Sequence, residues 1–170
     1  LLYALTRARI ASLGGTPHFS ILETGTSAGF SSLCLAKALV DGAASGHVIT
    51  IDALEHDRKQ YWNKFGDEDG QRTRRELLAG WKEESERIVF LAGFSSKVLP
   101  KVGIQRIHLA FLDGSHFSKN VLEEYEFVKR HQVPGDLIIF DDVTPGKFDG
   151  IVSAVGSVSR SDYEVRYLES

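Results

Sequence analysis

The sequence of 170 residues contains no methionine, one cysteine and four prolines. A domain of this size ordinarily carries a few methionines. We therefore interpret the chain as a trimmed piece, or as one in which residues are missing and the numbering closes over the gaps. The single cysteine, Cys34, excludes an internal disulfide and a zinc site built from cysteines. Because it lies on a predicted apolar helix face, we expect it to be a buried, unreactive thiol.

The sequence also lacks long apolar runs and a strong charge of either sign. No run approaches the about 20 apolar residues of a membrane helix, and the N-terminal segment has no signal-peptide pattern. We therefore predict a cytoplasmic protein that does not contact a membrane. A net charge of −3 gives no electrostatic argument for nucleic-acid binding. The hydrophobic content of 42% is typical of one globular domain.

Short, nearly continuous apolar segments alternate with segments of helical periodicity. Such strands are typical of a parallel sheet that is buried on both faces. We predict an α/β, Rossmann-like, doubly wound sheet, mostly parallel, with helices on both faces. Strands are expected at 19–25, 47–54, 87–93, 107–114, 136–143 and 163–168. Helices are expected at 1–13, 30–39, 55–65, 72–86, 95–102, 119–131 and 151–158.

The whole chain, 1–170, is predicted to be a single domain. An N-terminal helix lies within 1–14, the core spans 19–143, and a C-terminal helix and strand occupy 148–170. The last antiparallel strand of such a sheet is expected to be absent, since no strand-like segment follows 163–168. An uncovered sheet edge would favour association, and a homodimer is one expectation.

Acidic residues end four of the five core strands. They are Glu23, Asp52, Asp113 and the pair Asp141 and Asp142. Ligands of open α/β sheets bind outside the carboxyl ends of the strands. Any one acid could instead be a helix cap or a solvated loop charge, but that explanation fits four strand ends poorly. We therefore expect a ligand site at this edge.

The stretch ETGTSAG, residues 23–29, has two interpretations. Gly25-Thr26-Ser27-Ala28-Gly29 matches the G-x-S-x-G turn of serine hydrolases, which would make Ser27 a nucleophile. Glu23, Gly25 and Gly29 also fit a glycine-rich loop that holds a nucleotide-like cofactor. The hydrolase requires a histidine after the acid, yet the last histidine, His131, lies inside a predicted helix. The cofactor loop is therefore favoured.

The segment LETGTSAGFSS resembles motif I of class I S-adenosylmethionine (SAM)-dependent methyltransferases, and Asp52 follows in the place of that family's ribose-binding acid. This resemblance implies that a carboxylate at Asp52 accepts hydrogen bonds from the ribose diol. It also implies cofactor contacts from the glycine-rich loop, the start of its helix and the loop after the third strand. The implied cofactor-binding residues are Glu23, Thr24, Gly25, Thr26, Ser27, Gly29, Ser31, Asp52, Gly93, Phe94, Ser95 and Asp113. For Phe94, core packing is an equally good explanation.

The segments FLAGFSSKVLP, IHLAFLDGSH and LIIFDDV resemble the catechol and caffeoyl-CoA type O-methyltransferases. That resemblance implies a divalent cation held by Asp113, Asp141 and Asp142, and an all-carboxylate set suits Mg2+ or Ca2+. Two residues depart from the pattern: Asp142 stands where that group usually has Asn, and His116 stands where it usually has Lys. Since imidazole titrates near neutral pH, His116 is predicted to be the general base, with Asp113 as its catalytic neighbour. Helix capping is the alternative for His116.

The predicted function is metal-assisted methylation of a small-molecule hydroxyl, with the acceptor unspecified. A SAM-fold protein with other metal chemistry, or without transfer activity, remains an alternative. A phospho-receiver module is disfavoured, because receivers carry their acid pair after the first strand, whereas Asp141 and Asp142 follow the fifth. The polar segment 61–87 is predicted to be a lid or substrate wall with Trp62 or Trp81 against the ligand, although both tryptophans fit equally well against the sheet. Arg72, Arg74 and Arg75 are expected on a solvated helix face, with contact to an anionic substrate as the alternative.

Overall fold

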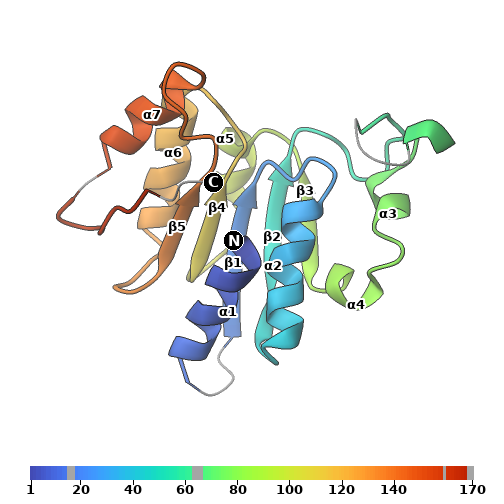
Figure 1. Ribbon diagram of the computed structural model, residues 1–170, viewed down its shortest axis with the longest axis horizontal. Coiled ribbons are helices and arrows are strands. Elements are labelled where there is room, and N and C mark those ends of the chain that lie inside the picture. The colour runs from blue at the N-terminus through green and yellow to red at the C-terminus, as the bar shows by residue number, and fades with distance from the viewer. Residues whose placement is uncertain (15–17, 63–66, 159, 168–170) are drawn as a thin grey trace.

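The computed structural model describes residues 1–14, 18–62, 67–158 and 160–167, which form an α/β fold around one parallel sheet (Figure 1). The strands are β1 His18–Thr24, β2 Ser45–Asp52, β3 Ile88–Ala92, β4 Leu109–Leu112 and β5 Leu137–Phe140. The α-helices are α1 Leu2–Ser12, α2 Phe30–Asp41, α3 Arg74–Leu77, α4 Lys82–Ser85, α5 Ser95–Val98, α6 Ser118–Lys129 and α7 Asp149–Gly156. Short 3-10 turns lie at Asp67–Asp69 (η1) and Leu99–Lys101 (η2). The predicted Rossmann-like architecture is confirmed.

The five strands have the order β3-β2-β1-β4-β5, and every neighbouring pair is parallel. The chain leaves β1 toward β2 on one side and returns to β4 on the other. The carboxyl ends of β1 and β4 therefore flank the topological switch point, where ligands of such sheets bind. This order also differs from the 2-1-3-4-5 order of receiver-type folds, so the phospho-receiver interpretation is wrong.

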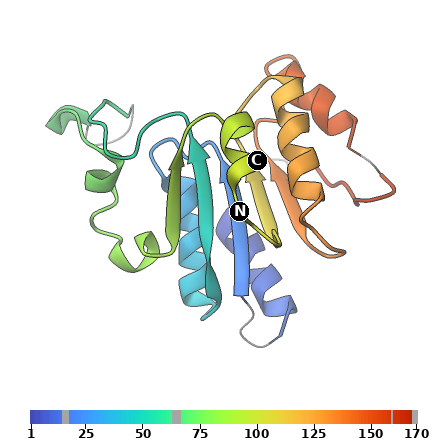
Figure 2. The same cartoon turned by 180° about the vertical axis from the view of Figure 1, so that it is seen from behind.

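Two apolar layers cover the faces of the sheet, because successive strand residues point to opposite faces. Phe19 and Ile21 of β1 pack with Leu35 and Leu39 of α2 on one face. On the other face, a second cluster joins the sheet to η2 and α6, and its members include Leu22, Ile51, Leu99, Leu112, Phe127 and Val128. Figure 1 shows α1 and α2 in front of the sheet, and Figure 2, from behind, shows α5 and α6 in front.

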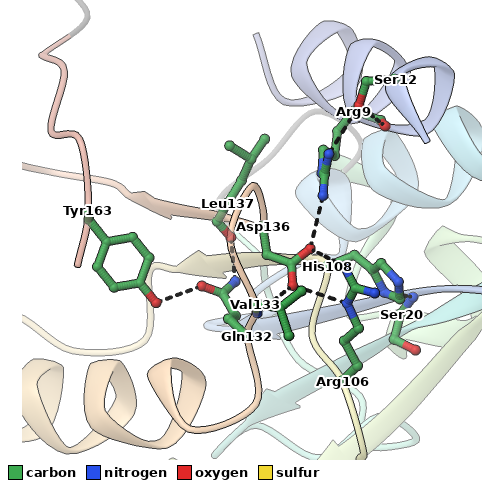
Figure 3. Close-up of polar contacts among 10 residues, drawn as sticks. All are labelled: Arg9, Ser12, Ser20, Arg106, His108, Gln132, Val133, Asp136, Leu137 and Tyr163. Atoms are coloured by element: carbon green, nitrogen blue, oxygen red, sulfur yellow. Dashed lines mark hydrogen bonds and ion pairs between the residues drawn. The ribbon is translucent and has the colours of Figure 1, made fainter.

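An ion-pair cluster closes the opposite, amino-terminal edge of the sheet (Figure 3). The side chain of Asp136 is fully buried, and its carboxylate accepts hydrogen bonds from Arg9 at 3.1 Å and from Arg106 at 3.0 and 3.1 Å. The backbone N–H of Val133 donates to the same carboxylate at 2.9 Å. Burial by itself raises the pKa of Asp136, but these donors outweigh burial and lower the pKa below its ordinary value. Asp136 thus joins α1, the segment before β4 and the start of β5.

Three predicted elements are wrong: the helices at 55–65 and 72–86 and the strand at 163–168. Residues 55–62 form no helix, because Gln60 and Arg72 pair in an isolated antiparallel bridge and Trp62 Nε1 donates to the carbonyl of Arg72 at 2.7 Å. The rest of that predicted helix, 63–65, lies outside the described residues. The predicted helix at 72–86 is divided into α3 and α4 around Gly80, a poor helix former.

The predicted strand at 163–168 is not formed over 163–167, and residue 168 lies outside the described residues. Instead, the hydroxyl of Tyr163 donates to Gln132 Oε1 at 2.9 Å, which attaches this segment by a side chain (Figure 3). The predicted burial of Cys34 is only partial. Within the described residues, no helix is both long and apolar enough to cross a membrane.

Candidate functional site

The loop between β1 and α2 is shaped by glycines that no other residue could replace without strain. Gly25 has φ +87°, and a Cβ atom added there would lie 2.3 Å from the carbonyl oxygen of Asp113. Gly29 has φ +92° and immediately precedes α2, whose first turn receives no side-chain cap. The first backbone N–H groups of α2 are therefore available to an anionic group. The backbone of β1 and β4 thus meets in a tight cradle at the switch point.

Glu23, near the end of β1, lies beneath this loop and is fully buried. Its carboxylate accepts hydrogen bonds from the hydroxyls of Ser32 and Thr50, the latter at 2.6 Å. Burial raises the pKa of Glu23, and the hydroxyls of Ser31, Ser32 and Thr50 oppose that rise. Thr26 is also buried, with its hydroxyl 2.6 Å from that of Thr50. The side chains of Glu23 and Thr26 thus support the loop from below and do not form its outer surface.

A second buried acid, Glu124 of α6, supports the loop from the other face of the sheet. The hydroxyl of Thr24 donates to Glu124 Oε2 at 2.9 Å. Burial raises the pKa of Glu124, while hydrogen bonds from Ser95 and Thr24 lower it. Glu124 was not predicted as a site residue, because a glutamate in an amphipathic helix ordinarily lies in solvent.

Asp52, the predicted ribose-binding acid, ends β2 beside the glycine-rich loop. It accepts hydrogen bonds from the backbone N–H of Ser27 at 2.5 Å and of Leu54 at 2.7 Å. Arg74 lies 3.6 Å from the same carboxylate and is only 2% exposed. The prediction of a solvated face is therefore wrong for Arg74, although Arg75 is exposed as expected and pairs with Asp57 at 2.8 Å.

The loop after β3 begins at Gly93, whose φ is +139°. Phe94 follows and is 72% exposed, so it is not a core residue. Ser95 begins α5. An exposed aromatic ring next to the ends of β2 and β3 offers a flat apolar surface to a ligand, which fits the predicted adenine contact.

At the ends of β4 and β5 the structure brings Asp113, His116 and Asp142 together. Each offers one ligand atom, and these three atoms lie within 4.8 Å of one another. Asp142 has an unusual φ of +56°, and its backbone N–H donates to Asp141 Oδ1 at 2.9 Å. Among the described residues, this group includes two of the three predicted metal ligands and adds His116 in place of Asp141.

Carboxylates at this edge repel one another. Burial, followed by the charges of Asp141 and Asp142, raises the pKa of Asp113 from 3.8 to about 7. His116 Nε2 lies 3.1 Å from Asp142 Oδ2, and its ring lies against Phe148, with 4.3 Å between centroids. Close approach of carboxylates that raise the pKa of Asp113 fits a site that a divalent cation would neutralise.

The two tryptophans and Ser27 complete the set of candidate residues. Trp62 is buried and packs against Arg74, with 5.2 Å between the guanidinium carbon and the ring centroid, whereas Trp81 is half exposed at the start of α4. For Trp62, packing is therefore the better interpretation. Among the residues that the structure describes, no histidine hydrogen-bonds Ser27, so nothing in the site activates Ser27 as a nucleophile.

Comparison with known proteins places this geometry in a family. Residues 22–143 match the family model described as "Methyltransferase domain". A proposed O-methyltransferase from Klebsiella pneumoniae superposes with a TM-score of 0.63 at 22% identity, covering 91% of this chain and 64% of that one. TomG, an O-methyltransferase of Streptomyces achromogenes, gives 0.61 at 20% identity, with 91% and 64% covered. An O-methyltransferase from Bacillus cereus gives 0.61 at 19%, with 91% and 65% covered.

This chain thus spans about two thirds of the length of these structures. No curated protein matches its sequence. The similarity to the solved structures, all at low identity, concerns the fold, and the family match covers both the cradle at β1 and the acids after β4 and β5. The chain belongs to the methyltransferase domain family.

Proposed function

We propose that this chain is a SAM-dependent O-methyltransferase that acts on a small-molecule hydroxyl with the help of a divalent cation. The observation that carries the proposal is the convergence, at one switch point, of the Gly25 cradle, Asp52 and the group of Asp113, His116 and Asp142. The family match supports it. The structures of TomG, in complex with SAM, and of the Bacillus cereus enzyme, in complex with S-adenosylhomocysteine (SAH), also support it, since both share this fold.

The cofactor would bind along the carboxyl ends of β1, β2 and β3. The backbone of Gly25, Ser27 and Gly29 and the start of α2 near Ser31 would receive the amino-acid half of SAM. Asp52 would accept hydrogen bonds from the ribose hydroxyls. The predicted adenine contacts come from the short segment Gly93, Phe94 and Ser95.

The metal would be held by Asp113 and Asp142, with Asp141 adjacent. When bound, SAM supplies the activated methyl group and a divalent cation lowers the pKa of the acceptor hydroxyl. The chain itself positions both reactants, which removes much of the entropic barrier to an in-line transfer.

His116 is proposed to take the proton of the acceptor hydroxyl. If Nε2–H donates to Asp142 Oδ2, over the observed 3.1 Å, then Nδ1 is the free acceptor. The carboxylate would orient the ring and stabilise the imidazolium that forms, as carboxylates do in other acid–base pairs. Phe148 holds the ring from one side.

The test is a methyl-transfer assay with radiolabelled SAM against a panel of catechol, sugar and phenolic acceptors, with and without chelator. We expect turnover that requires a divalent cation, and turnover that survives chelation would contradict the catechol-type assignment. His116→Ala should lower turnover about 100-fold without weakening SAM or metal binding. The control is His47→Ala, which removes an exposed histidine from the body of β2, away from the carboxyl ends of the strands.

His116 also belongs to the group that could hold the metal, so metal affinity is measured for the same variant. A loss of metal affinity in His116→Ala would make His116 a ligand and remove it as base. Binding of SAM without methylation of any acceptor would favour the alternative, a SAM-fold protein with different chemistry. Cytoplasmic location and a homodimer remain predictions.

A further inference from the structure

Arg74, the first residue of α3, is a buried cation at the edge of the proposed cofactor site. Its side chain is 2% exposed, although α3 is only four residues long and the side chain of its neighbour Arg75 is 69% exposed. A buried guanidinium is costly unless its donors are committed. Arg74 Nε donates to the loop that would hold the cofactor, and Nη1 and Nη2 each lie 3.4 Å from the carbonyl oxygen of Leu54, after β2.

Arg74, Ser27 and Asp52 form a closed triangle. Arg74 Nε donates to the carbonyl of Ser27 at 2.7 Å, and Arg74 Nη2 lies 3.6 Å from Asp52 Oδ2. The third side is the hydrogen bond from Ser27 N to Asp52 Oδ2, at 2.5 Å. Both polar groups of the Ser27 backbone are thus held, and Ser27 is a non-glycine residue with φ +48°, a left-handed conformation that only glycine adopts freely.

Aromatic rings keep water away from this guanidinium. The guanidinium carbon lies 5.2 Å from the centroid of Trp62 and 5.7 Å from that of Phe90. Burial lowers the pKa of Arg74, while the charges of Asp52 and Glu23 oppose that change. Arg74 is therefore a dry, fixed positive charge between the acids at the ends of β1 and β2.

We propose that Arg74 is a positioning residue that orients the Asp52 carboxylate toward the ribose hydroxyls, so that binding of the cofactor depends on those hydroxyls. This proposal rests on the proposed function. A carboxylate offers about four acceptor directions. The backbone N–H groups of Ser27 and Leu54 use one on each oxygen of Asp52. Arg74 holds the carbonyl of the Ser27 residue whose N–H binds Oδ2, and its own Nη2 lies 3.6 Å from that oxygen, so the remaining acceptor directions are presented to a vicinal diol. Without Arg74, Asp52 and the strained Ser27 peptide lose their common anchor.

The test compares two ligands on two variants by isothermal titration calorimetry. The ligands are SAH and its 2′-deoxy counterpart, which lacks one ribose hydroxyl. Arg74→Gln removes the buried guanidinium, and Arg75→Gln, next to it on α3, removes an exposed guanidinium with the same charge. We expect the wild type and Arg75→Gln to prefer SAH over the deoxy ligand by about tenfold. Arg74→Gln should bind SAH about tenfold more weakly while the deoxy ligand is nearly unaffected, so the preference disappears.

If Arg74 had a purely structural role, Arg74→Gln would weaken the binding of both ligands by the same factor and keep the preference for SAH. That result would overturn the proposal. Unchanged binding of SAH by Arg74→Gln overturns it as well. If Arg74→Gln is unfolded by circular dichroism, Arg74→Lys replaces it, since lysine keeps the charge but cannot hold Ser27 and Asp52 together. A preference of Arg74→Lys equal to that of the wild type would overturn the proposal, and a lost preference would support it.

Coupling to Asp52 gives a second readout. In Asp52→Asn, the further change Arg74→Gln should cost less than about twofold in SAH affinity, because the residue through which Arg74 acts is already altered. Full additivity of the two losses would contradict the proposal. Failure of the wild-type chain to bind SAH would instead overturn the proposed function, so the two failures are distinguishable.

Discussion

Replacing Asp113 by Asn removes one of the charges that repel one another after β4 and β5. In the native protein the pKa of this carboxyl is raised from 3.8 to about 7, first by burial and then by Asp141 and Asp142. A pKa raised on folding means that the protonated form favours the native state. The contribution of Asp113 to the free energy of unfolding is fully present below pH 3.8 and is lost as the pH rises through about 7.

The magnitude follows from these two pKa values. The difference of 7 − 3.8 corresponds to about 4 kcal/mol at about 1.4 kcal/mol for each pH unit. Asp113 is only partly buried, so solvent screening reduces the expected effect to about 1 to 2 kcal/mol. At pH 8 and without metal, Asp113→Asn should therefore be more stable than the wild type by this amount. For a chain of this size the melting temperature should rise by about 2 to 8 °C.

The assay is thermal unfolding in chelator at several pH values between 5 and 8. The advantage of Asp113→Asn should grow from pH 5 to 8, and an added divalent cation should stabilise the wild type and reverse the order. Glu55→Gln, which removes an exposed charge of the same sign, should change stability by less than about 0.5 kcal/mol. Equal stability of Asp113→Asn and the wild type at every pH would mean that the charge of Asp113 does not destabilise the native protein.

Two further changes test the cradle and the amino-terminal edge. Gly25→Ala should destabilise the chain by about 2 to 4 kcal/mol and abolish cofactor binding, because its Cβ would lie 2.3 Å from the carbonyl oxygen of Asp113. The control Gly80→Ala, with open space around its Cβ, should be tolerated. Equal chemical unfolding curves for the two variants would contradict this expectation. Asp136→Asn should cost about 3 kcal/mol, since it leaves two arginines without their buried partner. Because the pKa of Asp136 is lowered on folding, the loss of stability in Asp136→Asn should be present above pH 3.8 and shrink at lower pH in urea titrations. A loss of stability that grows toward acid pH would contradict the lowered pKa.

The sheet and the position of the site are predictable from the sequence because both depend on local pattern. Buried parallel strands are continuously apolar, and their carboxyl ends lie at one edge, so the strand pattern alone puts Asp52, Asp113 and Asp142 at that edge. Glu23 is predicted at the same edge, but its burial beneath the loop depends on Thr50 of a neighbouring strand. Contacts between strands far apart in sequence have no local signature.

The segment between β2 and β3 could not be predicted, because long-range contacts decide its conformation. A bridge between Gln60 and Arg72 prevents the expected helix, and a capping box between Thr73 and Glu76 begins α3 only at Arg74. That T-x-x-E pattern was the one sequence signal for the true helix start. Two adjacent arginines are typical of a solvated face, and the burial of Arg74 depends on contacts with residues far from it in sequence, such as Ser27, Trp62 and Phe90.

The C-terminal segment illustrates the same limit. The alternating pattern from Tyr163 onward is typical of a strand, but a strand also needs an edge to pair with, and the described residues 160–167 pair with none. The contact from Tyr163 to Gln132 holds this segment instead.

Isothermal titration calorimetry of the wild-type chain with SAH shows whether the Gly25 cradle and Asp52 form a cofactor site. We expect one-to-one binding that Asp52→Ala weakens about tenfold or more, since the ribose loses its charged acceptor. We also expect chelation of divalent cations to leave SAH binding largely intact, because Gly25 meets the backbone of Asp113, whereas a cation would be held by the side chains of Asp113 and Asp142. Absence of SAH binding at ligand concentrations on the order of 1 mM would contradict the account.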